Sequence, residues 1–317
     1  MPQSLKSLIL PLAMLTGGIF YDFFAELAVA IPYFIFAMLF LSFSRLSPGE
    51  VRPHRLQFLL LLIQIGGGLA LYYGLAFFNT TLAEGTFICV LAPTAMAASV
   101  ITGMLGGKVG FTAGYTLISH VAAAFVAPVV FAFIGHSEGL PFFQTFTYIC
   151  GQLAPMLLLP LGAAWGLRWL LPKANAKIAS YGHLTFYIWA LSLTSITGRT
   201  VRFLVEQPAP DYRIETTIAL LSLLVCLAQF KGGKALGSFL GDRIAVGQTL
   251  GQKNTILAIW MAQSYLNPIA SVGPASYVLW QNLINSYQIW LKGHREKTNR
   301  KNSEEPAKKI AHTKNNV

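Results

Sequence analysis

Long apolar runs alternate with short charged clusters along most of the chain. Residues 56–83, 85–107, 109–137 and 139–167 contain no Asp, Glu, Lys or Arg, and residues 254–291 form a further uncharged run. A helix that crosses a bilayer needs about 20 apolar residues, so each of these runs can cross at least once. The pattern predicts ten membrane-spanning helices, at residues 7–21, 28–45, 56–78, 85–105, 109–134, 142–167, 178–200, 216–240, 244–266 and 271–291.

The composition supports the same interpretation. Of the 317 residues, 54% are hydrophobic and 11% are charged, and the mean hydropathy is +0.56, whereas soluble chains carry about 25% charged residues. These values exclude a disordered chain, a secreted disulfide scaffold and a soluble nucleic-acid binder. The three cysteines, Cys89, Cys150 and Cys226, lie inside apolar runs and are expected to be packing residues.

The placement of positive charge predicts the orientation in the membrane. With the N-terminus, the even-numbered turns and the C-terminus on one side, that side holds every Lys and Arg except Arg199, Arg202, Arg213 and the intramembrane Lys253. Lys and Arg concentrate in cytoplasmic loops, so we expect a multi-pass protein of the cell (inner) membrane with both termini cytoplasmic. The basic tail, residues 293–317, is predicted to be a disordered anchor beside the bilayer with no nucleic acid as partner.

Ten spans with both ends inside divide into two sets of five. Because five is odd, two similar halves have opposite orientations, which is the inverted-repeat plan of many secondary transporters. We therefore expect an all-α polytopic membrane protein with one repeat over residues 1–139 (spans 1–5) and the other over residues 140–292 (spans 6–10).

Two spans carry signals of a break at corresponding places. Span 4 contains Ala92-Pro93-Thr94, and a proline removes a backbone donor and disrupts the preceding turn. Span 9, its counterpart, contains the polar stretch 247–255. Corresponding interrupted spans point to a binding site near the middle of the membrane, so spans 4 and 9 are predicted to be broken there.

Few polar side chains are expected deep in the spans. No Asp or Glu is expected there, and Glu84 is placed in the turn before span 4, which leaves Lys253 and His120 as ionisable candidates. A lysine at the bilayer centre costs about 2.5–3.5 kcal/mol, so Lys253 either serves a site or extends its amine to the cytoplasmic face. His120 is expected to be buried and bonded to a neighbour. Gln64 serves either a site or a hydrogen bond between helices.

Enzyme motifs are missing from the sequence. The chain has no His-Glu-x-x-His zinc motif, no intramembrane Asp pair, no Gly-x-Ser-x-Gly elbow and no phosphate-binding loop. We therefore expect neither an enzyme nor an ATP-driven transporter, and the energy source for transport is an ion gradient or the substrate's own gradient.

Around spans 4–5 and 9–10 the sequence resembles the bile acid:sodium symporter family. Residues 92–100 resemble the family's Pro-Gly-Gly-Thr-Ala-Ser-Asn crossover, and residues 251–255 resemble its Glu-x-Gly-x-Gln-Asn-Ser stretch. The likeness runs over most of residues 7–291, with further matches at Ile31-Pro32-Tyr33, Gln64, Pro128 and Trp280-Gln281-Asn282.

The resemblance implies a secondary transporter that moves an organic anion, steroid-like or a small carboxylate, by alternating access. It implies a core of spans 3–5 and 8–10, with spans 4 and 9 crossing, and a panel of spans 1, 2, 6 and 7. The anion would bind in the crevice between them, where a half-helix begins near Thr94. The candidate substrate-binding residues are Thr94, Ala95, Met96, Asn254, Gln281 and Asn282.

The family's sodium sites carry over only in part. The candidate ion-coupling residues are Gln64, Ser99, Ser119, Gln248, Thr249 and Lys253. The family's bridging glutamate falls on Thr249 and its span-9 glutamine on Lys253, so at least one sodium site is predicted to be lost, and no other cofactor is expected. We expect the Lys253 ammonium to replace a sodium ion and to donate to the unwound carbonyls, to Gln64 and to Thr249. Transport would then be independent of sodium if the lysine stays protonated, or coupled to protons if it loses and regains its proton during the cycle.

Two other functions fit parts of the sequence. Loss of the coupling residues also suits a membrane receptor or sensor that keeps an anion-binding crevice. An arsenite exporter, a relative with a reactive cysteine directly after the crossover proline, is disfavoured because Thr94 occupies that position.

Overall fold

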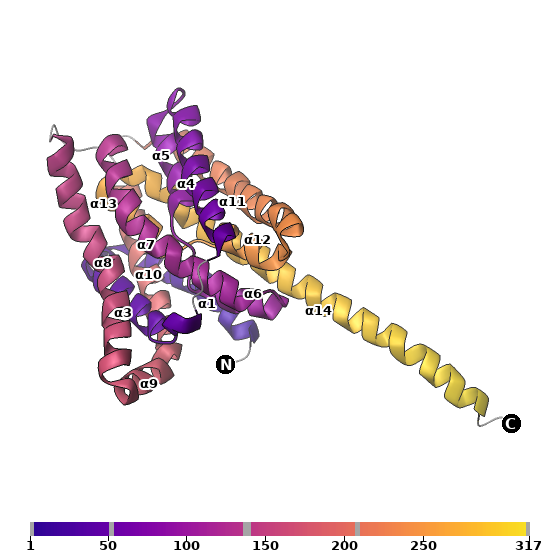
Figure 1. The fold of residues 1–317 in the computed structure, drawn as a ribbon. Helices are drawn as coiled ribbons and strands as arrows, with labels where there is room; N and C mark the ends of the chain where they lie inside the picture. The colour runs from indigo at the N-terminus through magenta and orange to yellow at the C-terminus, as the bar shows by residue number, and fades with distance from the viewer. Residues whose placement is uncertain (1–2, 51–53, 136–140, 207–209, 315–317) are drawn as a thin grey trace.

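The computed structural model describes residues 3–50, 54–135, 141–206 and 210–314. Within these ranges the chain is helical and forms no β-sheet (Figure 1). The elements are α1 (Gln3–Ile19), α2 (Tyr21–Leu27), η1 (Ala28–Ala30), α3 (Ile31–Phe43), η2 (Pro48–Glu50), α4 (Arg55–Ala76), α5 (Thr80–Leu91), α6 (Ala97–Leu105), α7 (Val109–Ile134), α8 (Phe142–Leu170), α9 (Pro172–Ser180), η3 (Tyr181–His183), α10 (Leu184–Val205), α11 (Tyr212–Leu240), α12 (Arg243–Gly251), α13 (Thr255–Tyr265), η4 (Pro268–Ser271) and α14 (Val272–Lys314).

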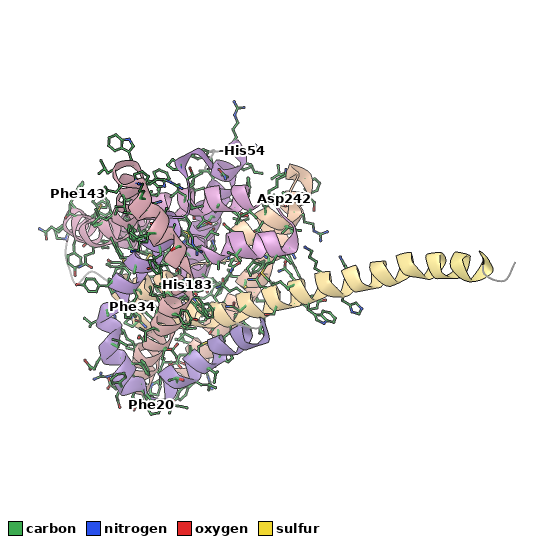
Figure 2. All side chains as sticks on the ribbon, turned by 90° about the horizontal axis from the view of Figure 1, so that it is seen from below. Phe20, Phe34, His54, Phe143, His183 and Asp242 are labelled. Atoms are coloured by element: carbon green, nitrogen blue, oxygen red, sulfur yellow. The ribbon has the colours of Figure 1, made fainter. Side chains whose placement is uncertain are left out.

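The surface of this helical body is apolar. Large side chains face outward, with exposed fractions of 91% for Phe77, 89% for Phe239 and 83% for Trp169, and Figure 2 shows Phe20 and Phe143 at the edge of the body. Water would penalise so much exposed apolar surface, whereas lipid does not. Among the described residues, five helical segments are long and apolar enough to cross a membrane: Tyr21–Phe43, Arg55–Ala76, Val109–Ile134, Phe142–Leu170 and Tyr212–Leu240. The protein is therefore an all-α protein with the character of a membrane protein.

Helical segments lie at all the predicted spans, although several boundaries differ from expectation, and two of them differ most. The helical run of the second span begins at Tyr21 instead of residue 28. At the other end, α14 continues to Lys314 and projects from the body (Figure 1), although the sequence predicts a disordered tail from residue 293. Lys, Arg, Glu and Ala are frequent in this segment, and their high helix propensity favours continuation of the helix.

Local capping explains where the broken helices start and stop. The Asn79 side chain accepts a hydrogen bond from Leu82 N at 2.9 Å and begins α5. Ala92 leaves the helical region, with φ −49° and ψ 136°, because the following Pro93 disfavours helical geometry in the residue before it. Asp242, labelled in Figure 2, caps α12 in the same way as Asn79 caps α5.

The helices form two packed groups. In the first, called the α10 group, α10 packs on α1, α2 and α3, and α3 packs on α8. In the second, called the crossover group, α5 packs on α4, α11, α13 and α14, and α12 packs on α6, α7 and α11. The groups meet where α7 contacts α8 and where α10 contacts α13. In Figure 1, α8 and α11 lie on opposite sides of the body.

Glu84 lies inside α5 and not in an exposed turn, which corrects the sequence expectation. Its exposed fraction is 0%, and its Oε2 accepts a hydrogen bond from Asn267 N at 2.9 Å. The capped helix begins at Thr80, before the uncharged run begins, because the capping side chain sets the helix start. Asp242 makes a matching contact, since its Oδ2 accepts from Lys108 N at 2.7 Å. Each carboxylate thus ties one broken helix to the turn that follows the other.

Candidate functional site

The two interrupted helices cross inside the crossover group. Residues 92–96, between α5 and α6, meet residues 252–254, between α12 and α13, at an isolated antiparallel β-bridge between Thr94 and Lys253. In each segment, the residue that follows the bridge residue donates its backbone N–H to the other segment, where the carbonyl of the residue before the bridge residue accepts it. These bonds join Ala95 N to Gln252 O at 3.0 Å and Asn254 N to Pro93 O at 2.8 Å. The breaks predicted in spans 4 and 9 are present.

The side chains of the two bridge residues make reciprocal contacts. Thr94 Oγ1 donates to Thr249 O at 2.7 Å, and Lys253 Nζ donates to Val90 O at 2.8 Å. Each acceptor lies four residues before the opposite bridge residue, in the last turn of α12 or α5. Each side chain therefore caps the carbonyl end of the other half-helix, where backbone acceptors lack partners within the helix.

The backbone N–H groups of the bridge residues are held by neighbouring helices. Thr94 N donates to Ser119 Oγ on α7 at 3.1 Å. Lys253 N donates to Gln281 Oε1 on α14 at 2.8 Å, and Gln281 Nε2 donates back to Lys253 O at 3.3 Å. The two long helices that follow the broken ones thus anchor equivalent positions of the crossing.

A tyrosine lies one helical turn before each anchor. Four residues before Ser119, Tyr115 donates to Gln64 Oε1 on α4 at 2.8 Å. Four residues before Gln281, Tyr277 donates to Gly251 O at 2.8 Å and accepts from Gln229 Nε2 on α11 at 3.0 Å. Each half of the crossing is therefore supported by a tyrosine and a glutamine on two flanking helices.

The carbonyl end of α5 is completely paired. An α-helix leaves its last four carbonyls without partners inside the helix, yet each of these accepts a bond here. The acceptors and donors are Ile88 O with Ala92 N at 3.1 Å, Cys89 O with Gln229 Nε2 at 3.2 Å, Val90 O with Lys253 Nζ at 2.8 Å, and Leu91 O with Gln64 Nε2 at 2.9 Å.

Lys253 is enclosed by protein, with an exposed fraction of 1%. This burial excludes one of the two alternatives for Lys253, namely that its amine extends to the cytoplasmic face of the membrane. The expected contacts with Gln64 and Thr249 are not formed by the ammonium, because Gln64 bonds the neighbouring carbonyls of Leu91 and Ala92. Within the described residues no carboxylate forms a salt bridge with Lys253. The ammonium is held at the negative end of the α5 dipole, which favours a positive charge.

The remaining ion-coupling candidates differ in position. Thr249 offers its carbonyl to the crossing and donates its hydroxyl to Ala245 O at 2.6 Å. Gln248 is fully buried and donates to Asn285 Oδ1 on α14 at 3.0 Å. Ser99 is half-buried in the first turn of α6, and no hydrogen bond joins its side chain to the crossing in the described part of the chain.

Asn254 connects the crossing to the α10 group. Its Oδ1 caps α13 by accepting from Leu257 N at 3.3 Å, and its Nδ2 lies 3.4 Å from His120 Nε2. The His120 ring is 1% exposed, contacts Thr116 O at 2.8 Å, and meets the Phe43 ring of α3 edge-on with centroids 6.0 Å apart. His120 is thus a buried histidine bonded to a neighbour, as expected.

A cavity of about 200 Å³ lies between the two groups. α1 and α10 line one side of it and α13 and α14 line the other. Most of the lining is apolar, and its hydroxyl groups come from Thr197, Thr200 and Ser276. An apolar cavity with a few oriented polar groups is the usual form of a small-molecule site.

Of the substrate-binding candidates, Asn282 lies on a helix face that lines this cavity, whereas the others are held elsewhere. Asn282 lies on the same face of α14 as the cavity-lining Ala275 and Leu279, but its Nδ2 donates to Val278 O of its own helix at 2.6 Å. Gln281 is committed to the Lys253 backbone. Thr94, just before the start of α6, is fully buried. Ala95 and Met96 there are half-buried.

Sequence reasoning missed several residues of the crossing, namely Tyr115, Tyr277, Gln229 and Asn285. Part of the signal was present in a short internal repeat. Tyr115-Thr116-Leu117-Ile118-Ser119 and Tyr277-Val278-Leu279-Trp280-Gln281 share Tyr-x-Leu-x followed by a polar residue. In the structure these two segments occupy equivalent positions on α7 and α14.

No family model matches this chain, and no curated protein matches it.

Proposed function

We propose that this protein is a secondary membrane transporter of an organic anion that works by alternating access, on a plan similar to that of the bile acid:sodium symporters. The observation that carries the proposal is the antiparallel crossing of two interrupted helices at Thr94 and Lys253. Broken backbone is tolerated at membrane depth only where protein or a cavity satisfies it. Paired broken helices are characteristic of transporter sites.

The proposed architecture has ten spans in two inverted repeats. Reciprocal hydrogen bonds across an antiparallel bridge are what a local two-fold axis produces, and they support this relationship between the halves. In this plan the crossover group is the core, the α10 group is the panel, and both termini are cytoplasmic. The repeats comprise residues 1–139 and 140–292.

The substrate is proposed to bind between panel and core. The positive end of the α6 dipole at Met96 attracts a carboxylate, and the amide groups of Asn254 and Asn282 are proposed to turn from their present partners, His120 and Val278 O, to the anion. The cavity of about 200 Å³ is smaller than the 300–1,000 Å³ of typical ligand pockets. Its size favours a small carboxylate over a steroid-like amphiphile.

Lys253 is proposed to make transport independent of sodium. A tethered ammonium already supplies one positive charge to the carbonyls that end α5. A second cation at 4 Å would be repelled by about 4 kcal/mol at an effective dielectric constant of 20. The anion's own gradient or exchange for another anion then drives the cycle.

Uptake into proteoliposomes tests the proposal. Radiolabelled pantoate and taurocholate serve as a small and a steroid-like probe, each with and without an inward sodium gradient. We expect uptake of the small probe with no dependence on sodium, and restored sodium dependence in the double variant Thr249→Glu with Lys253→Gln. A steep sodium requirement in the unmodified protein would contradict the role of Lys253.

A receptor or sensor is the alternative from another class. It would bind the anion to the purified protein without moving it across the vesicle membrane. Binding measured by calorimetry together with absent uptake would therefore favour the receptor over the transporter. An arsenite exporter remains disfavoured, because Thr94 has no thiol.

A further inference from the structure

A polar stripe runs along one face of α14. Gln281, Asn285, Gln288 and Lys292 follow one another at spacings of four, three and four residues, which places them on the same face of a helix. The cavity-lining residue Leu279 lies two positions before Gln281, a rotation of about 200°. The stripe therefore points into the crossover group, away from the cavity.

The stripe connects the crossing to the far end of α6. Gln281 pairs with the backbone of Lys253 at one end. In the middle, Asn285 Oδ1 accepts from Gln248 Nε2 at 3.0 Å. At the other end, Lys292 Nζ donates to Met104 O in the last turn of α6 at 2.9 Å. With Gln252, which directly precedes Lys253, these amides form what we call the amide seam: Gln248, Gln252, Gln281, Asn285 and Gln288.

Four amide atoms of the seam are buried without a partner among the described residues. They are Gln248 Oε1, Gln252 Oε1, Asn285 Nδ2 and Gln288 Nε2. The exposed fractions of the first three residues are 0%, 5% and 4%. A buried polar atom left unpaired is unfavourable, so four such atoms on the facing helices α12 and α14 and the residue after α12 indicate a ligand that pairs with them.

The chemistry of the four atoms selects the ligand. Two are acceptors and two are donors, so a cation would satisfy only the oxygens and an anion only the amide nitrogens. Water donates and accepts, and buried water molecules typically bond otherwise unpaired polar groups.

We propose that a file of internal water molecules occupies the amide seam and connects the crossing at Lys253 with the face of the membrane where α6 ends. The file lies within the crossover group, on the other side of α14 from the cavity. It gives species of the size of water an approach to the crossing that does not pass through the substrate crevice. In the proposed topology this approach opens on the cytoplasmic side.

Silver ions, which are small enough to follow a file of water, test the proposal. Ag⁺ bonds to the sulfur of a thiol and releases the thiol proton. In a background with Cys89, Cys150 and Cys226 replaced by alanine, single variants Gln248→Cys and Asn285→Cys are exposed to Ag⁺ in vesicles of either orientation. Thiols that remain free are counted with a maleimide-polyethylene glycol after denaturation in detergent.

Equally buried positions on the same two helices provide controls. Val246→Cys on α12 and Val278→Cys on α14 replace side chains that are 1% exposed and pack in apolar clusters. We expect Ag⁺ to react at least tenfold faster at Gln248→Cys and Asn285→Cys than at the controls, and only from the cytoplasmic side. The bulkier 2-(trimethylammonium)ethyl methanethiosulfonate should not react at any of the four.

Equal rates at seam and control positions would overturn the proposal, and so would reaction from the opposite side only. Should either seam variant fail to fold, Gln288→Cys replaces a half-buried side chain nearer the end of the seam and carries the same expectation. The test uses no transported substrate, so its failure is distinguishable from failure of the transport proposal.

Discussion

Thr94 and Lys253 cap each other's half-helices. Thr94 Oγ1 donates to Thr249 O at 2.7 Å, and Lys253 Nζ donates to Val90 O at 2.8 Å. The two contacts are geometrically equivalent but differ in charge. Only the carbonyl end of α5 faces a side chain that can carry a positive charge, whereas the carbonyl end of α12 is capped by neutral hydroxyl groups. The crossing is thus symmetric in hydrogen bonding and asymmetric in electrostatics.

Replacement of Lys253 should lower the free energy of unfolding more than replacement of Thr94. Lys253→Met leaves Val90 O buried without its donor, and we expect the free energy of unfolding to fall by about 1–3 kcal/mol. Thr94→Val removes one neutral hydrogen bond, with an expected loss of about 0.5–1.5 kcal/mol. Tryptophan fluorescence during unfolding of the detergent-solubilised protein measures both. An unchanged unfolding midpoint in Lys253→Met would mean that the ammonium does not cap α5.

Tyr115 and Tyr277 should contribute similar amounts to the free energy of unfolding. Tyr115→Phe removes the donor to Gln64, and Tyr277→Phe removes the donor to Gly251 O. Each leaves a buried acceptor unpaired, with an expected cost of about 1–3 kcal/mol in the same unfolding assay. Tyr33→Phe, at a side chain that is 77% exposed, is the control and should leave the midpoint unchanged. A neutral effect at both buried positions would contradict their supporting role.

Cysteine labelling should report both termini on the cytoplasmic side. The sequence places Glu84 in a turn outside the membrane, but its side chain is buried, so it cannot serve as an accessible labelling position. Tyr212→Cys should react with a membrane-impermeant maleimide from outside, and Lys173→Cys only from inside. Glu84→Cys should react from neither side. Reaction of the first two from the same side would refute the topology.

A bulky side chain in the cavity should stop transport. Ala275→Trp fills part of the roughly 200 Å³ space between α10 and α14, and we expect at least a tenfold loss of anion uptake. Leu283→Trp, on the same helix at a side chain that is 62% exposed, is the matched control and should retain uptake. Similar activity in both variants would place the substrate path elsewhere.

The amides near the crossing should contribute to anion binding. Asn282→Ala is expected to weaken binding at least tenfold, which equals about 1.4 kcal/mol. Asn254→Ala would also remove the cap of α13, so Asn254→Ser, which can still cap the helix, separates the two roles. Equilibrium binding of radiolabelled anion measures each variant. Unchanged affinity in both Asn254→Ser and Asn282→Ala would exclude these amides from the site.

The periodic apolar runs were enough to locate the helices, because a membrane helix must satisfy its own backbone and be apolar along its length. The break before Thr94 was also visible in the sequence, since Pro93 forces Ala92 out of the helical region. The polar stretch 247–255 indicated the second break for a different reason, because its side chains suit protein surroundings better than lipid.

Tertiary structure alone decided which groups meet at the crossing. Thr94 bonds a carbonyl 155 residues away, and Lys253 bonds one 163 residues away, so no local pattern specifies these partners. The sequence placed Lys253 next to Gln64 and Thr249, whereas packing brings its ammonium to Val90 O. Glu84 looked like a turn residue because charge marks turns in apolar chains, yet Asn267 N pairs with its carboxylate inside the protein. Hydropathy determines which segments enter the membrane, and the pairing of backbone groups between distant segments determines how their polar atoms are satisfied there.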